Sequence, residues 1–231
     1  MIDASNQDGR QASLQAEYDY IVVGAGAAGS VLAAELSASD ARVLVIESGG
    51  PDEVHQLPVV TPEVASRFGA PPPDAFTIAP ALVQPTSKGS VRLASRNFQD
   101  AAVIDGNYLG TDHDVAAVGR AIEAARAIGN QHAFDSLREG ELIPGPQAST
   151  EEIRELARLA SASFGHAVGT CKMGVDELAV VGPELRVHGI LGLRVADASV
   201  MPRIITGPGT NASTHMIAGR AAELMLGRNA Q

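Results

Sequence analysis

The chain has 231 residues, of which 45% are hydrophobic and 19% are charged, and it contains 24 glycines. This composition is typical of a globular protein that can bury a core and form one large or two small domains. The formal net charge is −10 and the basic residues are scattered, which disfavours a nucleic-acid or anionic-membrane partner and favours small neutral molecules.

The cysteine content and the N-terminal sequence exclude further classes. The single cysteine, Cys171, excludes a disulfide within the chain, and no cysteine or histidine cluster predicts a metal site. Residues 1–17 lack the basic and apolar regions of a secretory signal, and no apolar run approaches the length of a membrane span. We therefore expect a cytoplasmic protein with a mobile tail over residues 1–17 and no metal.

Residues 20–47 form the clearest pattern, which is a strand, a glycine turn, a helix, a second strand and an acid. Tyr20–Val23 and Val43–Ile46 are short, uncharged and rich in β-branched residues, which predicts strands buried on both faces. Residues 27–36 are mostly apolar and predict a helix that covers the sheet. The turn matches the pattern G-x-G-x-x-G and consists of Gly24, Ala25, Gly26, Ala27, Ala28 and Gly29.

This turn has the features of a dinucleotide-binding site. The first glycine permits the tight turn, the second lets a diphosphate approach the backbone, and the third lets helix and strand pack closely. The diphosphate then lies at the N–H groups of a helix N-terminus. Glu47 follows Gly29 by 18 residues, close to the spacing at which a carboxylate binds the adenosine ribose. The pattern predicts FAD or NAD and disfavours NADP, and a purely structural βαβ unit is the alternative.

The middle of the chain predicts a linker followed by a small sheet. Pro51 to Pro73 contains six prolines, a density that excludes helix and central strand across most of the run. From Phe76 to Leu109 the pattern changes to short β-like segments, with a turn at residues 87–90. These predicted segments are 77–78, 81–83, 90–93 and 103–104.

Two amphipathic helices are predicted next. Thr111 as N-cap, with Asp114 three residues later, predicts a capping box for a helix that ends at Gly129. A second helix begins at Thr150. The side chains expected to face the core are Val115, Val118, Ile122, Ala125 and Ile128 in the first helix, and Ile153, Leu156, Ala157 and Ala160 in the second.

The last third contains most of the reactive side chains. The glycine-spaced segment 164–174 brings a histidine, a thiol and a lysine near one another, and residues 189–199 predict a turn and a strand that stops at Asp197. Thr210 or Asn211 then caps a closing helix. Its predicted inward side chains are Met216, Ile217, Ala221, Leu224 and Met225.

At these residues the sequence resembles the glucose-methanol-choline (GMC) family of flavin oxidoreductases. The resemblance is carried by Tyr20–Gly50, by residues 85–109, and by residues 166–174 continuing through 192–199 to the final helix. It implies an α/β fold with a Rossmann-like FAD-binding parallel sheet and a reduced second sheet in an α+β substrate domain. The implied domains are a discontinuous FAD domain (18–50 and 165–231), the linker 51–73 and a reduced substrate domain (74–164).

The resemblance implies FAD as cofactor and oxidation of an alcohol by hydride transfer to the flavin. Residues 24–29 would hold the diphosphate, Glu47 the ribose, and Asp197 with Ala198 the flavin phosphate and ribityl chain. The start of the closing helix, at Thr210, would lie at the pyrimidine edge of the flavin. Its partial positive charge there would stabilise the anionic reduced form.

The resemblance also assigns two catalytic positions. His166 matches the family histidine that takes or orients the alcohol proton, a task that suits imidazole because it exchanges protons near neutral pH. Asn211 is the best match to a second position, a histidine or asparagine that shares the substrate oxygen. The loop before it is one residue longer than the usual form, so a strict count lands on Pro208, and His215 is a weaker substitute. Cys171 is expected to be a packed thiol.

The chain differs from the family in length. The segment that normally lies between the first βαβ unit and the substrate sheet is replaced here by the proline-rich run, so the sheet is expected to have uncovered apolar edges. A homo-oligomer that covers them is one expectation. Two functions stay open: a compact FAD-dependent alcohol oxidase or dehydrogenase, or an internally deleted, nucleotide-binding remnant that acts as an interaction domain. An NAD-dependent enzyme is a third alternative, and the alcohol and the electron acceptor are not specified.

Overall fold

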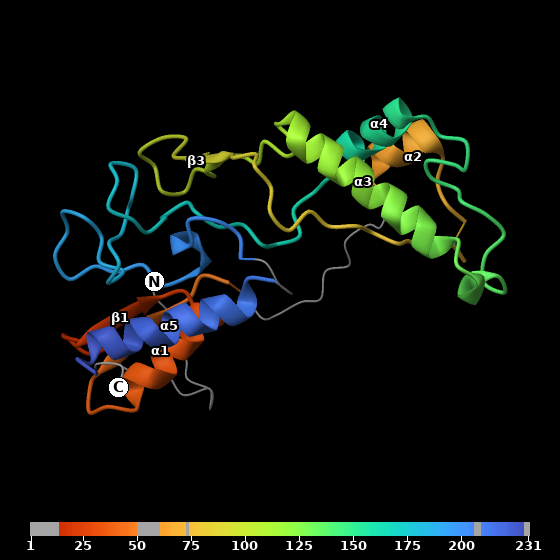
Figure 1. Cartoon of the computed structure of the whole chain (residues 1–231). Coiled ribbons are helices and arrows are strands. Elements are labelled where there is room, and N and C mark those ends of the chain that lie inside the picture. Colours follow the sequence, from red (N-terminus) through yellow and green to blue (C-terminus); the bar gives the residue numbers. More distant parts are fainter. Residues whose placement is uncertain (1–13, 50–60, 73, 206–208, 229–231) are drawn as a thin grey trace. The chain divides into compact units, whose positions relative to one another are not determined.

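The computed structural model describes residues 14–49, 61–72, 74–205 and 209–228 (Figure 1). The chain divides into two compact units. Unit 1 comprises Met1–Pro51, Cys171–Val200 and Thr210–Gln231, and unit 2 comprises Asp52–Thr170 and Met201–Gly209. Most of the predicted N-terminal tail and the first part of the predicted linker lie outside the described residues. The domain boundaries inferred from the resemblance stay a prediction.

Unit 1 is built on the predicted strand–turn–helix–strand segment. Strand β1 (Tyr20–Val23), helix α1 (Ala27–Ser37) and strand β2 (Val43–Ile46) follow in order, and the strands pair in parallel from Tyr20↔Val43 to Val23↔Ile46. The closing helix α5 (Asn211–Met225) lies along α1 (Figure 1). The Rossmann-like α/β class is therefore confirmed.

Helices α1 and α5 approach closely because small side chains meet between them. Leu36 of α1 is fully buried, and the buried residues of α5 include Ala218, Ala221 and Ala222 beside Ile217. The prediction for Ile217 and Ala221 is confirmed. The prediction that Met216 faces inward is wrong, because its side chain is exposed. The buried face of α5 is formed by Ile217 and the alanines that follow it.

One face of the two-stranded sheet is open. Val22 points toward α1 and is buried, whereas Ile21 and Val23 on the opposite face are 59% and 81% exposed. Ile46, which pairs with Val23, is also exposed. The prediction that these strands are buried on both faces is wrong, because within the described residues the sheet has two strands and a helical cover on one side only. The expectation of uncovered apolar surface is confirmed.

The segment Cys171–Val200 completes unit 1 through irregular backbone pairing. Cys171 N–H donates to the Ser199 carbonyl at 3.0 Å, and Met173 N–H donates to the Val200 carbonyl at 2.8 Å. The strand predicted to end at Asp197 is not formed. Gly189 and Gly192 both adopt a left-handed φ, so the chain turns twice, and the bridge between Arg186 and Arg194 is one of three isolated bridges in the described part of Cys171–Val200.

The described part of unit 2 combines three α-helices with a short antiparallel pair. Its elements are α2 (Pro62–Phe68), β3 (Ser90–Arg92), β4 (Val103–Asp105), α3 (Asp112–Gly129), the 3₁₀ turn η1 (His132–Phe134) and α4 (Thr150–Ala160). Helix α4 packs against both α2 and α3. The second sheet is therefore the pair β3–β4, and the segments 77–78 and 81–83 are not strands.

Helix α2 lies within the proline-rich run, which the sequence predicts to be a linker without helix over most of its length. Pro62 occupies the first helical position, where its missing N–H removes no hydrogen bond and its fixed φ suits the helix. Thr61 caps the helix by accepting a hydrogen bond from Val64 N–H at 3.3 Å, and Gly69 ends it. Arg67 then forms an ion pair with Glu155 of α4 at 3.0 Å, which joins the two helices.

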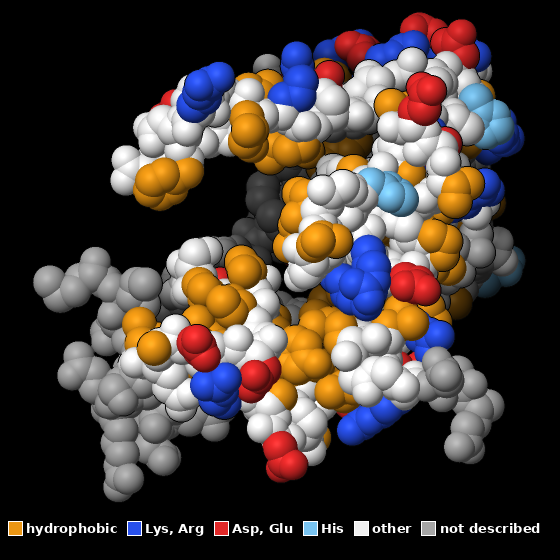
Figure 2. Space-filling model, turned by 90° about the vertical axis from the view of Figure 1, so that its left-hand side faces the viewer, with side chains coloured by type: hydrophobic (Ala, Val, Ile, Leu, Met, Phe, Trp, Pro, Cys, Tyr) orange, Lys and Arg blue, Asp and Glu red, His pale blue; other side chains and the backbone are white. Residues whose placement is uncertain are grey.

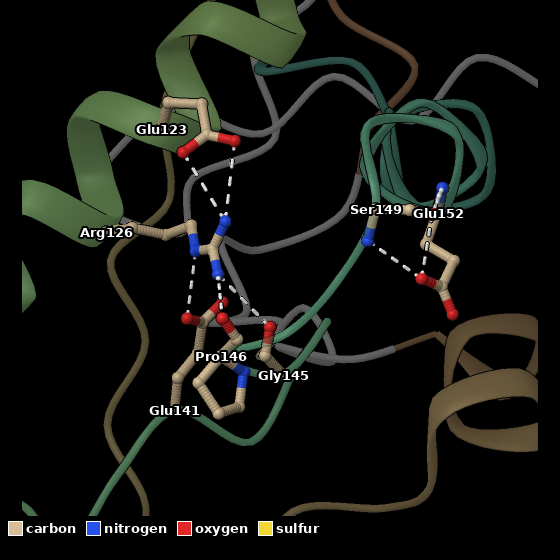
Figure 3. Close-up of polar contacts among 7 residues, drawn as sticks. All are labelled: Glu123, Arg126, Glu141, Gly145, Pro146, Ser149 and Glu152. Carbon is tan, nitrogen blue, oxygen red and sulfur yellow. Dashed lines mark hydrogen bonds and ion pairs between the residues drawn. The ribbon is translucent and has the colours of Figure 1, made fainter.

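The caps of α3 and α4 follow from their sequences, but their predicted faces are only partly buried. Thr111 accepts from Asp114 N–H, and Ser149 and Glu152 form a complete capping box at the start of α4 (Figure 3). In α4 the predicted core residues other than Ala160 are buried. In α3 only Val115 of the predicted face is buried, and Ile128 near the end of the helix is exposed.

An arginine on α3 fixes the loop that leads to α4. Arg126 Nε donates to Glu141 Oε2 at 2.9 Å, and its Nη2 donates to the carbonyls of Gly145 and Pro146 at 3.2 and 3.0 Å (Figure 3). Arg126 also contacts Glu123 one turn earlier on the helix. The side chains of Arg126 and Glu141 are mostly buried, so this network fixes the loop to α3 and is not a solvent-exposed surface ion pair.

Asp114 has a different role from the reciprocal cap that the sequence predicts. Its carboxylate is fully buried and accepts hydrogen bonds from Thr86 N–H at 2.9 Å, Ser87 N–H at 2.8 Å and both of their hydroxyl groups. Burial by itself would raise the pKa of Asp114, but the hydrogen bonds from Ser87 and Thr86 outweigh burial and hold the pKa well below its ordinary value. The carboxylate thus joins residues 86–87 to the start of α3.

We expect the substitution Asp114→Asn to lower the unfolding free energy by about 3 kcal/mol near neutral pH, because the donors of Thr86 and Ser87 lose the buried, charged acceptor that they share. Since the folded-state pKa is depressed, the wild-type carboxylate contributes fully above about pH 4 and progressively less below it. The unfolding free energy measured with denaturant should therefore decrease less steeply with falling pH in the variant than in the wild type. Asp112→Asn, an exposed acid in the same helical turn, should change the unfolding free energy by less than about 1 kcal/mol. Equal losses in both variants would contradict the role of Asp114.

Apolar side chains reach the surface in several groups on the face drawn in Figure 2. Within the described ranges, no helix is long and apolar enough to cross a membrane. The same ranges contain no group of three or more histidine, cysteine or acidic side chains that could hold a metal ion.

Candidate functional site

The three glycines of the turn between β1 and α1 serve different physical needs. Gly24 has a φ of +92°, which favours glycine. A Cβ at Gly29 would lie 1.8 Å from the Gly24 carbonyl oxygen, so only glycine lets helix and strand approach this closely. A Cβ at Gly26 would meet no described atom within 4 Å. Contacts within the described protein therefore explain Gly29 but not Gly26, which faces open space where a ligand can approach the backbone.

The start of α1 offers N–H groups to that space. Gly26 is the N-cap residue, and the helix has neither a side-chain cap nor an acidic residue in its first turn. The first backbone bond of the helix runs from Ser30 N–H to the Gly26 carbonyl at 2.9 Å, so the N–H groups of Ala27, Ala28 and Gly29 precede the helical bonding pattern. Such an uncapped N-terminus suits a diphosphate.

Glu47 lies at the end of β2 and reaches back to the turn. Its Oε2 accepts from Ala25 N–H at 2.6 Å, and its Oε1 accepts from Gly49 N–H at 2.6 Å. These two backbone donors hold the pKa of the Glu47 carboxyl below its ordinary value, so the group is anionic over the physiological pH range. Each carboxylate oxygen has a further lone pair, which leaves acceptor capacity for ribose hydroxyls.

The other predicted cofactor-binding residues lie in the same unit. Asp197 is exposed just before the 3₁₀ turn η2 (Ala198–Val200), and its Oδ1 accepts from Ser199 N–H at 2.9 Å. The turn η2 contacts helix α5. Thr210 is the N-cap residue of α5, is buried, and does not cap the helix through its side chain. Its carbonyl instead accepts the Thr214 hydroxyl at 2.8 Å.

His166 lies in unit 2 and is half-buried. Its imidazole packs edge-on against the ring of Phe164, with 5.6 Å between ring centroids and 65° between ring planes. The backbone of Gly209 also lies close to the ring, since a Cβ at Gly209 would be 2.8 Å from His166 Nε2. The sequence gives no direct signal for this contact. A glycine in a loop suggests a positive φ, which Gly209 has, but it does not indicate a contact with His166.

The remaining predicted positions are more exposed. Asn211 and His215 are exposed at the start of α5, and Cys171 is half-buried. Pro208 lies outside the described residues. All ten predicted cofactor-binding residues and Asn211 belong to unit 1, whereas His166 and Gly209 belong to unit 2.

Together, the parallel pair, the glycine turn and the acid at the end of β2 define a dinucleotide-binding α/β protein. Residues 22–50 match the family model described as NAD(P)-binding Rossmann-like domain, and residues 85–218 match the one described as GMC oxidoreductase. The latter match covers more than half of the chain. The chain belongs to the GMC oxidoreductase family, as its sequence predicts.

Individual relatives agree with this assignment. The chain is 43% identical to an oxygen-dependent choline dehydrogenase of Escherichia coli O45:K1 over 145 residues, which are 62% of the chain and 26% of that enzyme. It is 45% identical over 143 residues to an oxygen-dependent choline dehydrogenase of Klebsiella pneumoniae, again 62% of the chain and 26% of the relative. The matched part thus spans about a quarter of the length of these curated relatives.

A solved structure supports the fold. Pyridoxine 4-oxidase, described as from Mesorbium loti, superimposes with a TM-score of 0.60 and 36% identity, over 64% of this chain and 29% of that chain.

Proposed function

We propose that the chain binds FAD and oxidises the CH–OH group of a small alcohol. The observation that carries this proposal is the open space at Gly26, framed by the uncapped start of α1 and by Glu47, in a chain of the GMC family. These residues fit a dinucleotide because they combine N–H donors for the diphosphate with an acceptor for the ribose. The relatives are named as a choline dehydrogenase and a pyridoxine oxidase, which favours an alcohol substrate.

In the proposed reaction the residues of unit 1 bind and orient the cofactor. FAD, when bound, supplies the hydride acceptor. Residues 24–29 hold the diphosphate, Glu47 the ribose, and Asp197 with Ala198 the segment next to the flavin. The start of α5 at Thr210 would offer the positive end of a helix dipole to the negative charge that develops on the flavin on reduction.

The residues near the substrate handle the proton. A ring nitrogen of His166 accepts the hydroxyl proton as the alcohol loses hydride, and the Asn211 amide donates a hydrogen bond to the substrate oxygen. His166 is half-buried beside the exposed ring of Phe164. His215 is the weaker alternative to Asn211, because it lies one helical turn further along α5.

We expect Glu47→Ala to weaken FAD binding by about tenfold to a hundredfold, because hydrogen bonds to a charged acceptor contribute about 1.5–3 kcal/mol each. A fluorescence titration with FAD measures this directly. Glu35→Ala, which removes an exposed acid from the middle of α1, is the control for lost charge and should bind FAD as the wild type does. A full flavin load in Glu47→Ala would refute the ribose assignment.

A second candidate is a nucleotide-binding remnant that acts as an interaction domain or homo-oligomer. It is favoured by the open face of the β1–β2 sheet and by the chain matching only 26% of its curated relatives. In this case the turn at residues 24–29 could still bind a nucleotide without turnover.

Reconstitution with FAD separates these functions. The enzyme proposal predicts about one flavin per chain and loss of its visible absorbance on anaerobic addition of choline, pyridoxine or benzyl alcohol. Stable flavin absorbance with every alcohol would support the remnant. Protein that cannot retain FAD at all would contradict the cofactor assignment.

A further inference from the structure

The orientation of the His166 imidazole depends on packing. The ring nitrogens of two other histidines contact polar partners, His132 with the Asp135 carboxylate and His188 with the Gly174 carbonyl. For His166, no hydrogen bond to either ring nitrogen is present in the described part of the chain. Among the described residues, no polar partner therefore fixes the ring.

Two contacts within unit 2 restrict the ring instead. Phe164 packs edge-on against one side of it. A Cβ at Gly209 would lie 2.8 Å from Nε2, 2.9 Å from Cε1 and 3.7 Å from Cδ2 of His166. The Nε2–Cε1 edge of the imidazole therefore occupies the space that a side chain at position 209 would fill.

We propose that Gly209 is a positioning residue for His166, because the missing side chain leaves room for the Nε2–Cε1 edge and the backbone then limits how the ring can turn. This inference rests on the proposed function for its catalytic consequence. The steric relation itself does not depend on a cofactor.

The substitution Gly209→Ala should move the imidazole more than the backbone. The contacted atoms are at the end of a side chain with two rotatable bonds, so the ring can swing away from the added methyl group. A displacement of about 1 Å in a catalytic group can lower a rate by about a hundredfold.

The matched control is Gly69→Ala. Gly69 also belongs to unit 2 and has a φ of +88°, compared with +124° at Gly209, so alanine is strained at both positions. A Cβ at Gly69 meets no described atom within 4 Å. The pair therefore separates backbone strain from contact with the imidazole.

The test measures two quantities in the FAD-reconstituted wild type and both variants. We expect kcat, with the alcohol that reduces the wild type fastest, to fall about tenfold to a hundredfold in Gly209→Ala while KM and flavin content change little. The NMR signal of the His166 Cε1 proton, assigned with a His166→Gln variant, should shift in Gly209→Ala and stay in place in Gly69→Ala.

The outcomes distinguish this inference from the function on which it rests. Absence of turnover in the wild type would refute the proposed function and leave the NMR comparison as the test of the steric relation. An unmoved His166 signal in Gly209→Ala would overturn the positioning role, whatever the turnover. A shifted signal with wild-type kcat would overturn it too.

Discussion

The substitution His166→Ala should slow reduction of the bound flavin by an alcohol about a hundredfold or more, at unchanged flavin content. General base catalysis contributes roughly that factor, and alanine has no group that accepts the hydroxyl proton. All ten predicted cofactor-binding residues lie in unit 1, so loss of a side chain in unit 2 should leave FAD binding intact. Anaerobic stopped-flow mixing with the alcohol measures the rate of reduction.

The control for this prediction is His113→Ala, which removes an exposed imidazole from the first turn of α3. It should reduce at the wild-type rate. Wild-type reduction in His166→Ala would remove this residue from the mechanism, and loss of flavin from the variant would show that the histidine acts in binding instead.

Two glycines of the same turn should respond to alanine in opposite ways. Gly26→Ala places its methyl group in open space, so we expect a loss of only about 0.5–1 kcal/mol in unfolding free energy but a drop of about a hundredfold in FAD affinity. Gly29→Ala places a methyl group 1.8 Å from the Gly24 carbonyl oxygen and should cost about 3 kcal/mol of stability. Denaturant unfolding without FAD and fluorescence titration with FAD measure the two effects.

Each variant is the control for the other. Wild-type FAD affinity in Gly26→Ala would show that no ligand approaches the backbone at that position. Wild-type stability in Gly29→Ala would contradict the close packing of α1 on β1. If both variants lose stability equally, the turn is explained by folding alone and the cofactor assignment loses its main support.

The parts of the fold that sequence predicts well are those fixed by neighbours along the chain. The β1–α1–β2 segment could be predicted because β-branched runs, a glycine turn and a helix-forming run occur within 27 residues, from Tyr20 to Ile46. Thr111 could be identified as a cap for the same reason. Helix α2 could not be predicted in this way, because its surroundings are rich in proline, which disfavours helix. A proline at the first helical position is nevertheless compatible with a helix.

The features that were missed depend on contacts between distant residues. Asp114 binds Thr86 and Ser87, which are 28 and 27 residues away, so its sequence context indicated only a local cap. The open face of β1 and β2 follows from how many strands and helices cover the sheet, which no single segment specifies. The relation of Gly209 to His166 depends on a contact between residues 43 positions apart, which no local pattern indicates.

The central claim is that the N-terminal turn and the C-terminal histidine serve one bound FAD. A crystal structure of the FAD-reconstituted protein tests this most directly. The account predicts the diphosphate at the N–H groups of residues 24–29 and the His166 imidazole facing the space above the flavin ring, close enough to take a proton from an alcohol there. An imidazole that points away from the flavin, beyond the reach of any substrate held on it, would contradict the account.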